Sequence, residues 1–413
     1  MHRSVNQAYV ALACAVLSAP GLAQVQVEAR NQMELGWMPG GWGSYQLLFE
    51  NPDGESARVV GWSGAWLIGG VQWGDPFGGS LDVAVPAGGS ARHDSIGYAP
   101  EELFAAAGDQ VPQYAGHVTV RAGETEYEVS FAFDVPAAVL PEPVLRKEGE
   151  FIALELMESR FEENESIKNV VRLLDLCYQA MADLTGLVPY DGEKITFREA
   201  PPHPFWAYAG NPIILNSDYV GSTMDDFERG IVSFGWVHEM GHDFDVLGDW
   251  YCWNGPAAEC QANFKLGYAL ETIDDPGMRI AWTFQAPDYP APDTSVLLPG
   301  RELVERFFVR FGDAYLADPD RGWESMTSDD VHSMLMRVQR TYGWEPFKAL
   351  YRTYGELAAN GARPPESAEG KISLMCAILS REIGVNLVPL FERWRLPVDE
   401  EAVAEVAGAY GLE

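Results

Sequence analysis

The first third of the chain alternates apolar and polar positions in short runs. SYQLLFE, ARVVGW, HVTVRA and YEVSFAFDV each change polarity with a period of two, and turn-forming stretches such as NPDGES and PAGGSA separate them. This alternation is typical of strands that bury only one face. Short strands at such regular spacing predict an antiparallel β-sandwich of immunoglobulin-like type over residues 24–135.

Two interpretations of this β domain stay open. It is either a spacer that supports the rest of the chain or an accessory module that binds glycans or another surface. The second interpretation would use an aromatic platform, for which Trp62, Trp66 and Trp73 are the candidates. Tryptophans in a sandwich lie more often in the core, which favours the spacer.

After residue 150 the apolar spacing changes to that of helices. The stretch 136–149 is rich in proline and lacks periodicity, so it predicts a linker. Residues 150–413 then predict a second domain with a mostly helical C-terminal half, which makes the fold class α+β. Within it, residues 222–247 predict one long helix, and Ser222 with Asp225 three residues later forms a plausible N-terminal cap.

The N-terminus has the composition of an export signal. Arg3 precedes an apolar stretch at 8–17, and Gly21-Leu22-Ala23 fits a small-x-small cleavage site. We therefore predict cleavage after Ala23 and an extracellular or periplasmic protein. The apolar stretch is too short to span a bilayer, and no longer one follows, so we expect no membrane span.

Charge and cysteine content narrow the possible partners and cross-links. With 28 basic and 61 acidic side chains, the chain would be repelled by nucleic acid and by anionic membranes. Export permits disulfides, and we predict one between Cys252 and Cys260 in the loop-like stretch CWNGPAAEC. Cys177 and Cys376 lie in helical patterns and are expected to be free and buried.

The candidate chemistry begins at His238-Glu239-Met240-Gly241-His242, an HExxH motif. Positions four apart share one face of a helix, so both imidazoles can reach one metal ion while Glu239 stands beside a bound water. The motif arises by chance in some chains, and the alternative is a pair of buried, hydrogen-bonded histidines. Its place in a helical pattern, with Phe227, Ile231 and Phe234 on the same stripe, favours zinc.

A catalytic zinc ion needs a third protein ligand and one open position. The three-histidine metzincin class would require glycine at Asp245 and histidine at Gly248, so it is excluded. The carboxylates that follow are Asp243, Asp245, Asp249, Glu259 and Glu271. The aspartates lie too close to the motif, whereas Glu259 opens a second predicted helix, as in a gluzincin. Glu271 is the second candidate.

The sequence resembles the viral enhancins and the bacterial mucin-degrading zinc peptidases. The resemblance rests on HExGH, a tryptophan-containing spacer and Glu-x-x-x-Asn. AYAGNPIILNSD (207–218) is similar to the family's Ala-Gly-x-Pro-Ile segment, and GVNLVPLFERWRLPVDEE (384–401) is similar to its C-terminal region. These landmarks follow the family's order over about residues 150–400.

The resemblance implies His238, His242 and Glu259 as ligands of Zn²⁺ and Glu239 as the general base. It also implies that Asn263 orients a ligand or the substrate, although a local capping role is an equal alternative.

The same resemblance places Ala209, Gly210 and Asn211 along the substrate cleft, unless this segment is an ordinary turn into a strand. Asp245 stands where the family usually has glutamine, and Asn211 stands where it often has an aromatic residue. These departures concern substrate preference more than zinc binding.

The leading hypothesis is an exported zinc endopeptidase that cuts glycoproteins, including O-glycosylated, mucin-like ones. One alternative is a non-catalytic carbohydrate- or surface-binding protein with a structural zinc site, against which the intact Glu239 argues. Another is a metallo-aminopeptidase, but the acidic G-x-M-E-N-type anchor of that class is missing from the sequence. The oxyanion donor stays open among Tyr208, Tyr251, His332 and Tyr342.

Overall fold

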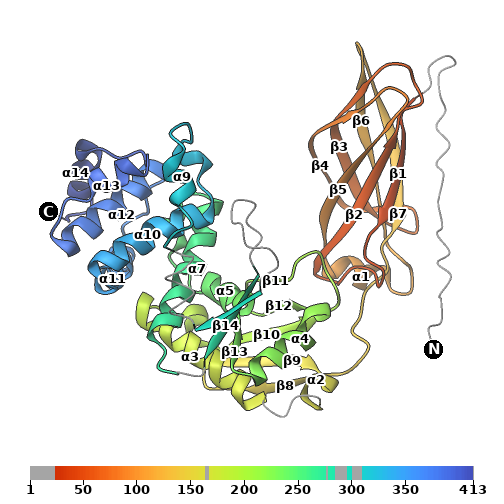
Figure 1. Cartoon of the computed structure of the whole chain (residues 1–413). Coiled ribbons are helices and arrows are strands. Elements are labelled where there is room, and N and C mark those ends of the chain that lie inside the picture. Colours follow the sequence, from red (N-terminus) through yellow and green to blue (C-terminus); the bar gives the residue numbers. More distant parts are fainter. Residues whose placement is uncertain (1–23, 163–166, 276–277, 284–294, 300–308, 413) are drawn as a thin grey trace. The chain divides into compact units, whose positions relative to one another are not determined.

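The computed structural model describes residues 24–162, 167–275, 278–283, 295–299 and 309–412 (Figure 1). The predicted export signal at 1–23 lies outside the described residues. The chain divides into two compact units. The first, here called the β unit, contains the residues up to Pro141 together with 200–206 and 216–218. The second, the mixed unit, contains 142–199, 207–215 and the residues from Tyr219 onward.

The β unit consists of two antiparallel sheets around one core (Figure 1). The three-stranded sheet has the order β1 (Gln26–Asn31), β2 (Gly41–Glu50), β5 (Ser90–Ala99). The four-stranded sheet has the order β4 (Val71–Val85), β3 (Ala57–Ile68), β6 (Gln113–Ala122), β7 (Thr125–Asp134), and α1 (Glu101–Ala107) follows β5. The alternation in sequence matches the burial: Tyr45, Leu47 and Phe49 of β2 point into the core, and their neighbours do not.

The tryptophans of β3 and β4 belong to this core or to its margin. Trp66 is buried, and Trp62 and Trp73 pack against the core while partly exposed. The ring of Trp62 contacts Phe77 edge-on, with centroids 5.9 Å apart. These contacts are those of packing residues.

A five-stranded sheet lies in the mixed unit. The strand of this sheet that comes first in the sequence occupies part of the predicted linker. The order is β11 (Ala207–Tyr208), β12 (Ile213–Asn216), β10 (Ile195–Ala200), β9 (Ile152–Met157), β8 (Val144–Glu148). β8 occupies the second half of the stretch 136–149 and pairs antiparallel with β9. Its residues VLRKE are exposed on both faces of an edge strand, so no alternation marked it in the sequence.

The single helix predicted over 222–247 is wrong. Three elements replace it: α4 (Ser217–Glu228), β13 (Ile231–Ser233) and α5 (Phe234–Asp243). Gly230 adopts a φ of 75° between α4 and β13, which a helix cannot continue through. Ser222 lies inside α4, and the cap of α5 is Ser233, whose side chain accepts a hydrogen bond from the Trp236 amide. The apolar stripe expected across Phe227 and Phe234 is therefore broken.

The C-terminal half is mainly helical, as predicted. Its helices are α6 (Gly248–Tyr251), α7 (Gly255–Thr272), α9 (Asp313–Ala317), α10 (Ser328–Tyr342), α11 (Glu345–Ala359), α12 (Ala368–Ile383), α13 (Val388–Arg393) and α14 (Glu400–Ala409). Nearer the start of the unit lie α2 (Glu158–Glu162) and α3 (Ile167–Thr185), which follows β9. A small sheet joins β13 to β14 (Arg279–Thr283) and β15 (Ser295–Pro299), and short 3₁₀ turns span Pro189–Gly192 and Trp323–Ser325.

The helix α7 is central to the mixed unit (Figure 1). It packs against α3, α5 and α10, and every residue from Cys260 to Leu270 is buried. Asn254 caps its start by accepting a hydrogen bond from the Ala257 amide. The described part of the chain is thus a mixed α+β protein, and it contains no helix with the length and apolar character needed to cross a membrane.

Candidate metal centre

The site is built where α5 crosses α7. Gly241 of α5 faces the backbone of Ala262, and a Cβ atom at position 241 would lie 2.7 Å from the Ala262 carbonyl oxygen. Such contacts are too short for any side chain, so glycine is what lets the two helices approach here. The crossing sets Glu259 and Asn263 of α7 opposite the two histidines of α5.

His238, His242 and Glu259 form a compact group, with one ligand atom of each within 4.8 Å of the others. The two Nε2 atoms are 3.2 Å apart, and Glu259 Oε2 lies 3.1 Å from His238 Nε2 and 3.6 Å from His242 Nε2. Zinc bonds of normal length in tetrahedral geometry separate neighbouring ligand atoms by about 3.3 Å. The donor set and its spacing therefore fit a zinc ion.

The electrostatics of this group favour a positive charge at its centre. Hydrogen bonds from His238 and His242 lower the pKa of the Glu259 carboxyl strongly. Burial lowers the pKa of His242, but Asp245 and Glu259 outweigh burial and raise the pKa to about 9. The surrounding carboxylates thus stabilise a cation at this point, whether a proton or a metal ion supplies the charge.

Glu239 follows His238 on α5 and differs from the other carboxylates. Burial raises its pKa, although His238 and His242 oppose the shift, as does a hydrogen bond from the Ala209 backbone. A carboxylate whose pKa is raised above its ordinary value is suited to take up a proton and return it.

The segment predicted to line the cleft is attached to α5 through Asp243. The Asp243 Oδ1 atom accepts hydrogen bonds from the Gly210 amide at 2.9 Å and from the Tyr190 hydroxyl at 2.8 Å. Burial raises the pKa of Asp243 to about 7. The contacts of Ala209 and Gly210 hold this segment beside Glu239 and the zinc-ligand candidates.

Gly210 and Asn211 have structural reasons for their identity. Gly210 has a φ of 134°, which favours glycine whatever lies nearby. The Asn211 side chain accepts a hydrogen bond from the Thr196 amide and donates one to the Lys194 carbonyl, so it fastens the segment to β10. Asn211 is therefore engaged with the protein backbone.

Each histidine has a polar neighbour at its second ring nitrogen. His238 Nδ1 lies 2.8 Å from Asn263 Oδ1, and His242 Nδ1 lies 3.6 Å from Asp245 Oδ2. Asp245 also accepts hydrogen bonds from Lys265 and, at 2.9 Å, from Tyr251. Sequence reasoning missed Lys265, although a lysine between Phe264 and Leu266 in a predicted helix was a signal that could have identified it.

The predicted disulfide is wrong, because Cys252 and Cys260 are free thiols. The stretch CWNGPAAEC is not a loop: helix begins at Gly255, and only Cys252 to Asn254 connect α6 to α7. Cys252 lies in this connection and Cys260 lies within α7, and burial raises the pKa of the Cys252 thiol to about 12. Cys177 and Cys376 are also free and buried, as expected.

The second candidate for the third ligand and two candidate oxyanion donors lie in different parts of the mixed unit. Glu271 lies at the opposite end of α7, where it pairs with Arg340 and accepts a hydrogen bond from Trp344 Nε1, so it does not reach the metal cluster. Among the candidate oxyanion donors, Tyr208 lies on β11 directly before Ala209. Tyr251 is fully buried, and its hydroxyl is engaged with Asp245.

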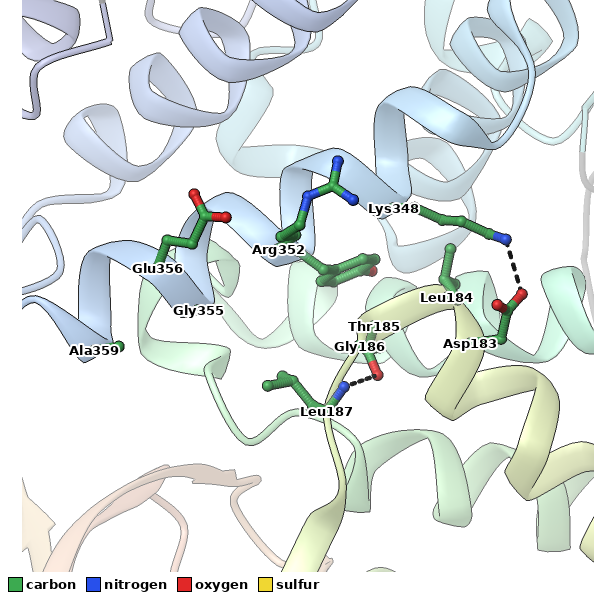
Figure 2. Close-up of a pocket in the computed structure, with 11 residues that line it drawn as sticks. Asp183, Leu184, Thr185, Gly186, Leu187, Lys348, Arg352, Gly355, Glu356 and Ala359 are labelled. Atoms are coloured by element: carbon green, nitrogen blue, oxygen red, sulfur yellow. Dashed lines mark hydrogen bonds and ion pairs between the residues drawn. The ribbon is translucent and has the colours of Figure 1, made fainter.

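A separate hollow of about 580 Å³ lies between the end of α3 and α11 (Figure 2). Asp183 and Lys348 form an ion pair on one side, with 2.8 Å between Oδ2 and Nζ. Arg352 and Glu356 also line it. The metal-ligand candidates are not among its lining residues, so this hollow is distinct from the candidate site.

Curated proteins that are similar to this chain include TRPM8 channel-associated factors, and no family model matches the chain. Factor 2 of Homo sapiens is 27% identical over 244 residues, which cover 58% of this chain and 23% of the human protein. Factor 1 of Homo sapiens is 24% identical over 251 residues, which cover 59% of this chain and 24% of that protein. The chain thus spans about a quarter of the length of these relatives.

Two solved structures show weak overall likeness. A functionally unknown conserved protein from Bacillus anthracis str. Ames has a TM-score of 0.49 and 14% identity, over 93% of this chain and 78% of that one. The catalytic module of the metalloprotease ZmpA from Clostridium perfringens has a TM-score of 0.40 and 12% identity, over 94% and 80%.

Proposed function

We propose that this chain is an exported zinc endopeptidase of the gluzincin type that cuts glycoproteins, including O-glycosylated ones. The observation that carries the proposal is the convergence of His238, His242 and Glu259 beside a buried Glu239. The two sheets of the β unit fit the immunoglobulin-like sandwich expected from the sequence, in the role of an accessory domain.

His238, His242 and Glu259 would hold the zinc ion through two Nε2 atoms and a carboxylate oxygen. Zinc in such a site polarises a peptide carbonyl and lowers the pKa of a water molecule. Glu239 takes the proton from the attacking water and passes it to the leaving amine, a role for which its raised pKa suits it.

The position of β11 supports a peptide as the substrate. β11 is one of the two edge strands of the five-stranded sheet, and Ala209, which follows it, contacts Glu239. An extended peptide that pairs with a free strand edge is bound through its main chain. A peptide added along β11 would therefore pass Glu239. Because the peptide would be held through its main chain, its N-terminus would need no anchor, and internal bonds would be cut.

The test compares wild type with Glu239→Gln on an O-glycosylated protein and on its deglycosylated form. We expect Glu239→Gln to retain zinc and to lose about 10²- to 10⁴-fold in cleavage rate, since it removes only the general base. Glu228→Gln, at an exposed position of α4, is the matched control and should cut normally. His238→Ala should lose zinc.

Several outcomes would contradict the proposal. Wild-type zinc content in His238→Ala would remove the metal assignment, and unchanged cutting by Glu239→Gln would remove the general base. Equal cutting of the two substrate forms would remove glycan dependence alone. Loss of cutting when the substrate N-terminus is acetylated would identify an aminopeptidase instead.

The second candidate is a protein-binding role without catalysis. It is favoured by the sequence similarity to proteins named as TRPM8 channel-associated factors. In this case wild type would hold zinc and leave both substrate forms intact. The same cleavage assay therefore separates the two candidates.

A further inference from the structure

The two histidines of the candidate site have different polar groups at their second ring nitrogens, an amide and a carboxylate. Both of these groups depend on α7. Asn263 of α7 offers a neutral amide oxygen to His238 Nδ1. Asp245, just beyond the end of α5, offers a carboxylate to His242 Nδ1. Lys265 of α7 in turn binds that carboxylate.

We propose that Lys265 is a positioning residue that acts on His242 through Asp245, so that α7 supplies the third ligand and also orients both imidazoles. The inference rests on the proposed zinc site, but not on hydrolysis. It assigns a role to Asp245, which stands where the family that the sequence resembles usually has glutamine, and to the buried Lys265.

The two oxygens of Asp245 have different surroundings. Oδ1 accepts hydrogen bonds from Lys265 Nζ and from the Tyr251 hydroxyl. Oδ2 is buried and receives no hydrogen bond from the groups that the structure describes. A buried carboxylate oxygen without a donor is costly, and His242 Nδ1 at 3.6 Å is in position to provide one.

This arrangement selects the tautomer of His242. When Nδ1 carries the proton and donates to Asp245, Nε2 is left as an acceptor that faces His238 and Glu259. That is the tautomer that a metal ligand requires. A carboxylate at the other ring nitrogen also makes the imidazole a stronger donor to a metal.

Lys265 is what keeps Asp245 in this position. Its side chain is fully buried, and Nζ also donates to the Gln261 carbonyl at 3.2 Å, one turn earlier on α7. The Gln261 side chain is itself held by the Tyr351 hydroxyl of α11 at 2.6 Å. A buried ammonium group is stable only when it is paired, so Lys265 and Asp245 need each other. Because Oδ1 is fixed from α7, Oδ2 is directed towards His242.

A purely structural interpretation of the same ion pair makes different predictions. The pair would then join the end of α5 to α7 and affect only the stability of the fold. The far end of α7 has such a pair, between Glu271 and Arg340, away from the metal cluster. It provides the matched control, because it is a charged pair on the same helix.

The experiment is a double-mutant cycle in the full chain. Asp245→Asn, Lys265→Met and the double variant are compared for zinc affinity, by competition with a chelator under conditions in which each is folded. We expect each single change to weaken zinc binding by roughly 10- to 100-fold, as for other partners of ligating histidines. The double variant should bind no more weakly than Asp245→Asn, since Lys265 acts through Asp245.

Two further measurements can contradict the proposal even if one of the single variants does not fold. The double variant buries no unpaired charge, so it should fold even if a single variant does not. Nitrogen-15 NMR of the metal-free protein, recorded above pH of about 9 where the His242 imidazole is neutral, should show His242 protonated at Nδ1 in wild type and in Glu239→Gln, and a mixture of tautomers in Asp245→Asn. This readout needs neither zinc nor catalysis, so it separates failure of the inference from failure of the proposed function.

The inference is overturned if the double variant is folded and binds zinc as tightly as wild type does. It is also overturned if the effects of the two single changes simply add, or if Glu271→Gln with Arg340→Met lowers zinc affinity as much. An unchanged His242 tautomer in Asp245→Asn would exclude the proposed route through Asp245.

Discussion

The described buried side chains of the β unit are almost all apolar, whereas those of the mixed unit include several charged groups. In the β unit, residues such as Phe49, Val59 and Val118 fill the core. In the mixed unit, the buried set includes Asp243, Asn263, Lys265, Asp330 and Glu199. Several of these groups have an ionic partner: Lys265 with Asp245, Asp330 with Arg321, and Glu199 with Arg160.

This difference distinguishes side chains that are needed mainly for the folded state from side chains that could take part in chemistry. An apolar core tolerates changes that keep its volume, and its residues are needed mainly for the folded state. Buried ionic pairs contribute little net stability, and removing one partner is strongly destabilising. One of these pairs, Lys265 with Asp245, lies at the α5–α7 crossing beside the candidate metal centre, so the proposed chemistry would be carried by the mixed unit. The comparison predicts that changes in the β unit alter stability alone.

The largest expected effect tests that last statement. Phe49→Ala should destabilise the β unit by about 3–5 kcal/mol, because Phe49 is fully buried and leaves a cavity. Thermal unfolding followed together with zinc content checks it. Phe77→Ala, at a residue that is 39% exposed, is the milder control. Loss of zinc in the Phe49 variant would show that the comparison is wrong and that the β unit supports the site.

The second-largest expected effect is a loss of folding stability in acid, to which each unit contributes through one buried histidine. Burial lowers the pKa of His332 in the mixed unit to about 3 and that of His203 in the β unit to about 4. The unfolded chain takes up a proton below pH of about 6.5, while the folded protein cannot, so stability falls as the pH falls. At pH 4 the loss from His332 is about 3 kcal/mol.

Urea unfolding at several pH values measures this. His332→Leu should flatten the pH dependence of the transition of the mixed unit, and His203→Leu that of the β unit. If the pH dependence of both transitions were unchanged in these variants, burial of these two histidines would not be the cause.

The smallest expected effect concerns the helix crossing. Gly241→Ala places a Cβ atom against the Ala262 backbone and should cost about 1–3 kcal/mol through overpacking. It should also weaken zinc binding, since α7 carries Glu259. Gly255→Ala, where a Cβ meets open space at the start of α7, is the control. Equal zinc affinity in Gly241→Ala and wild type would show that the crossing distance does not set the site.

Local patterns predicted some elements and misled for others. The alternation in β2 matches its burial, and the helix expected from ECQANFKLGYALE is the body of α7. β8 was missed because an edge strand exposed on both faces shows no alternation. The helix predicted over 222–247 failed because helical spacing of apolar residues continued across Gly230, where the backbone changes direction.

The candidate site divides in the same way. The sequence by itself determined the relative places of His238, Glu239 and His242, because the geometry of one helix is local and fixes residues one and four apart. It also left Glu259 as one of two carboxylates for the third ligand position, the other being Glu271.

Only the tertiary structure decided how α7 meets α5. The crossing at Gly241 and Ala262 brings Glu259 and Asn263 to the histidines, while the partner of Glu271 proves to be Arg340. It also joins Asp245 to Lys265, twenty residues away. The physical reason is that contacts between helices depend on packing among residues distant in sequence, which no local periodicity records.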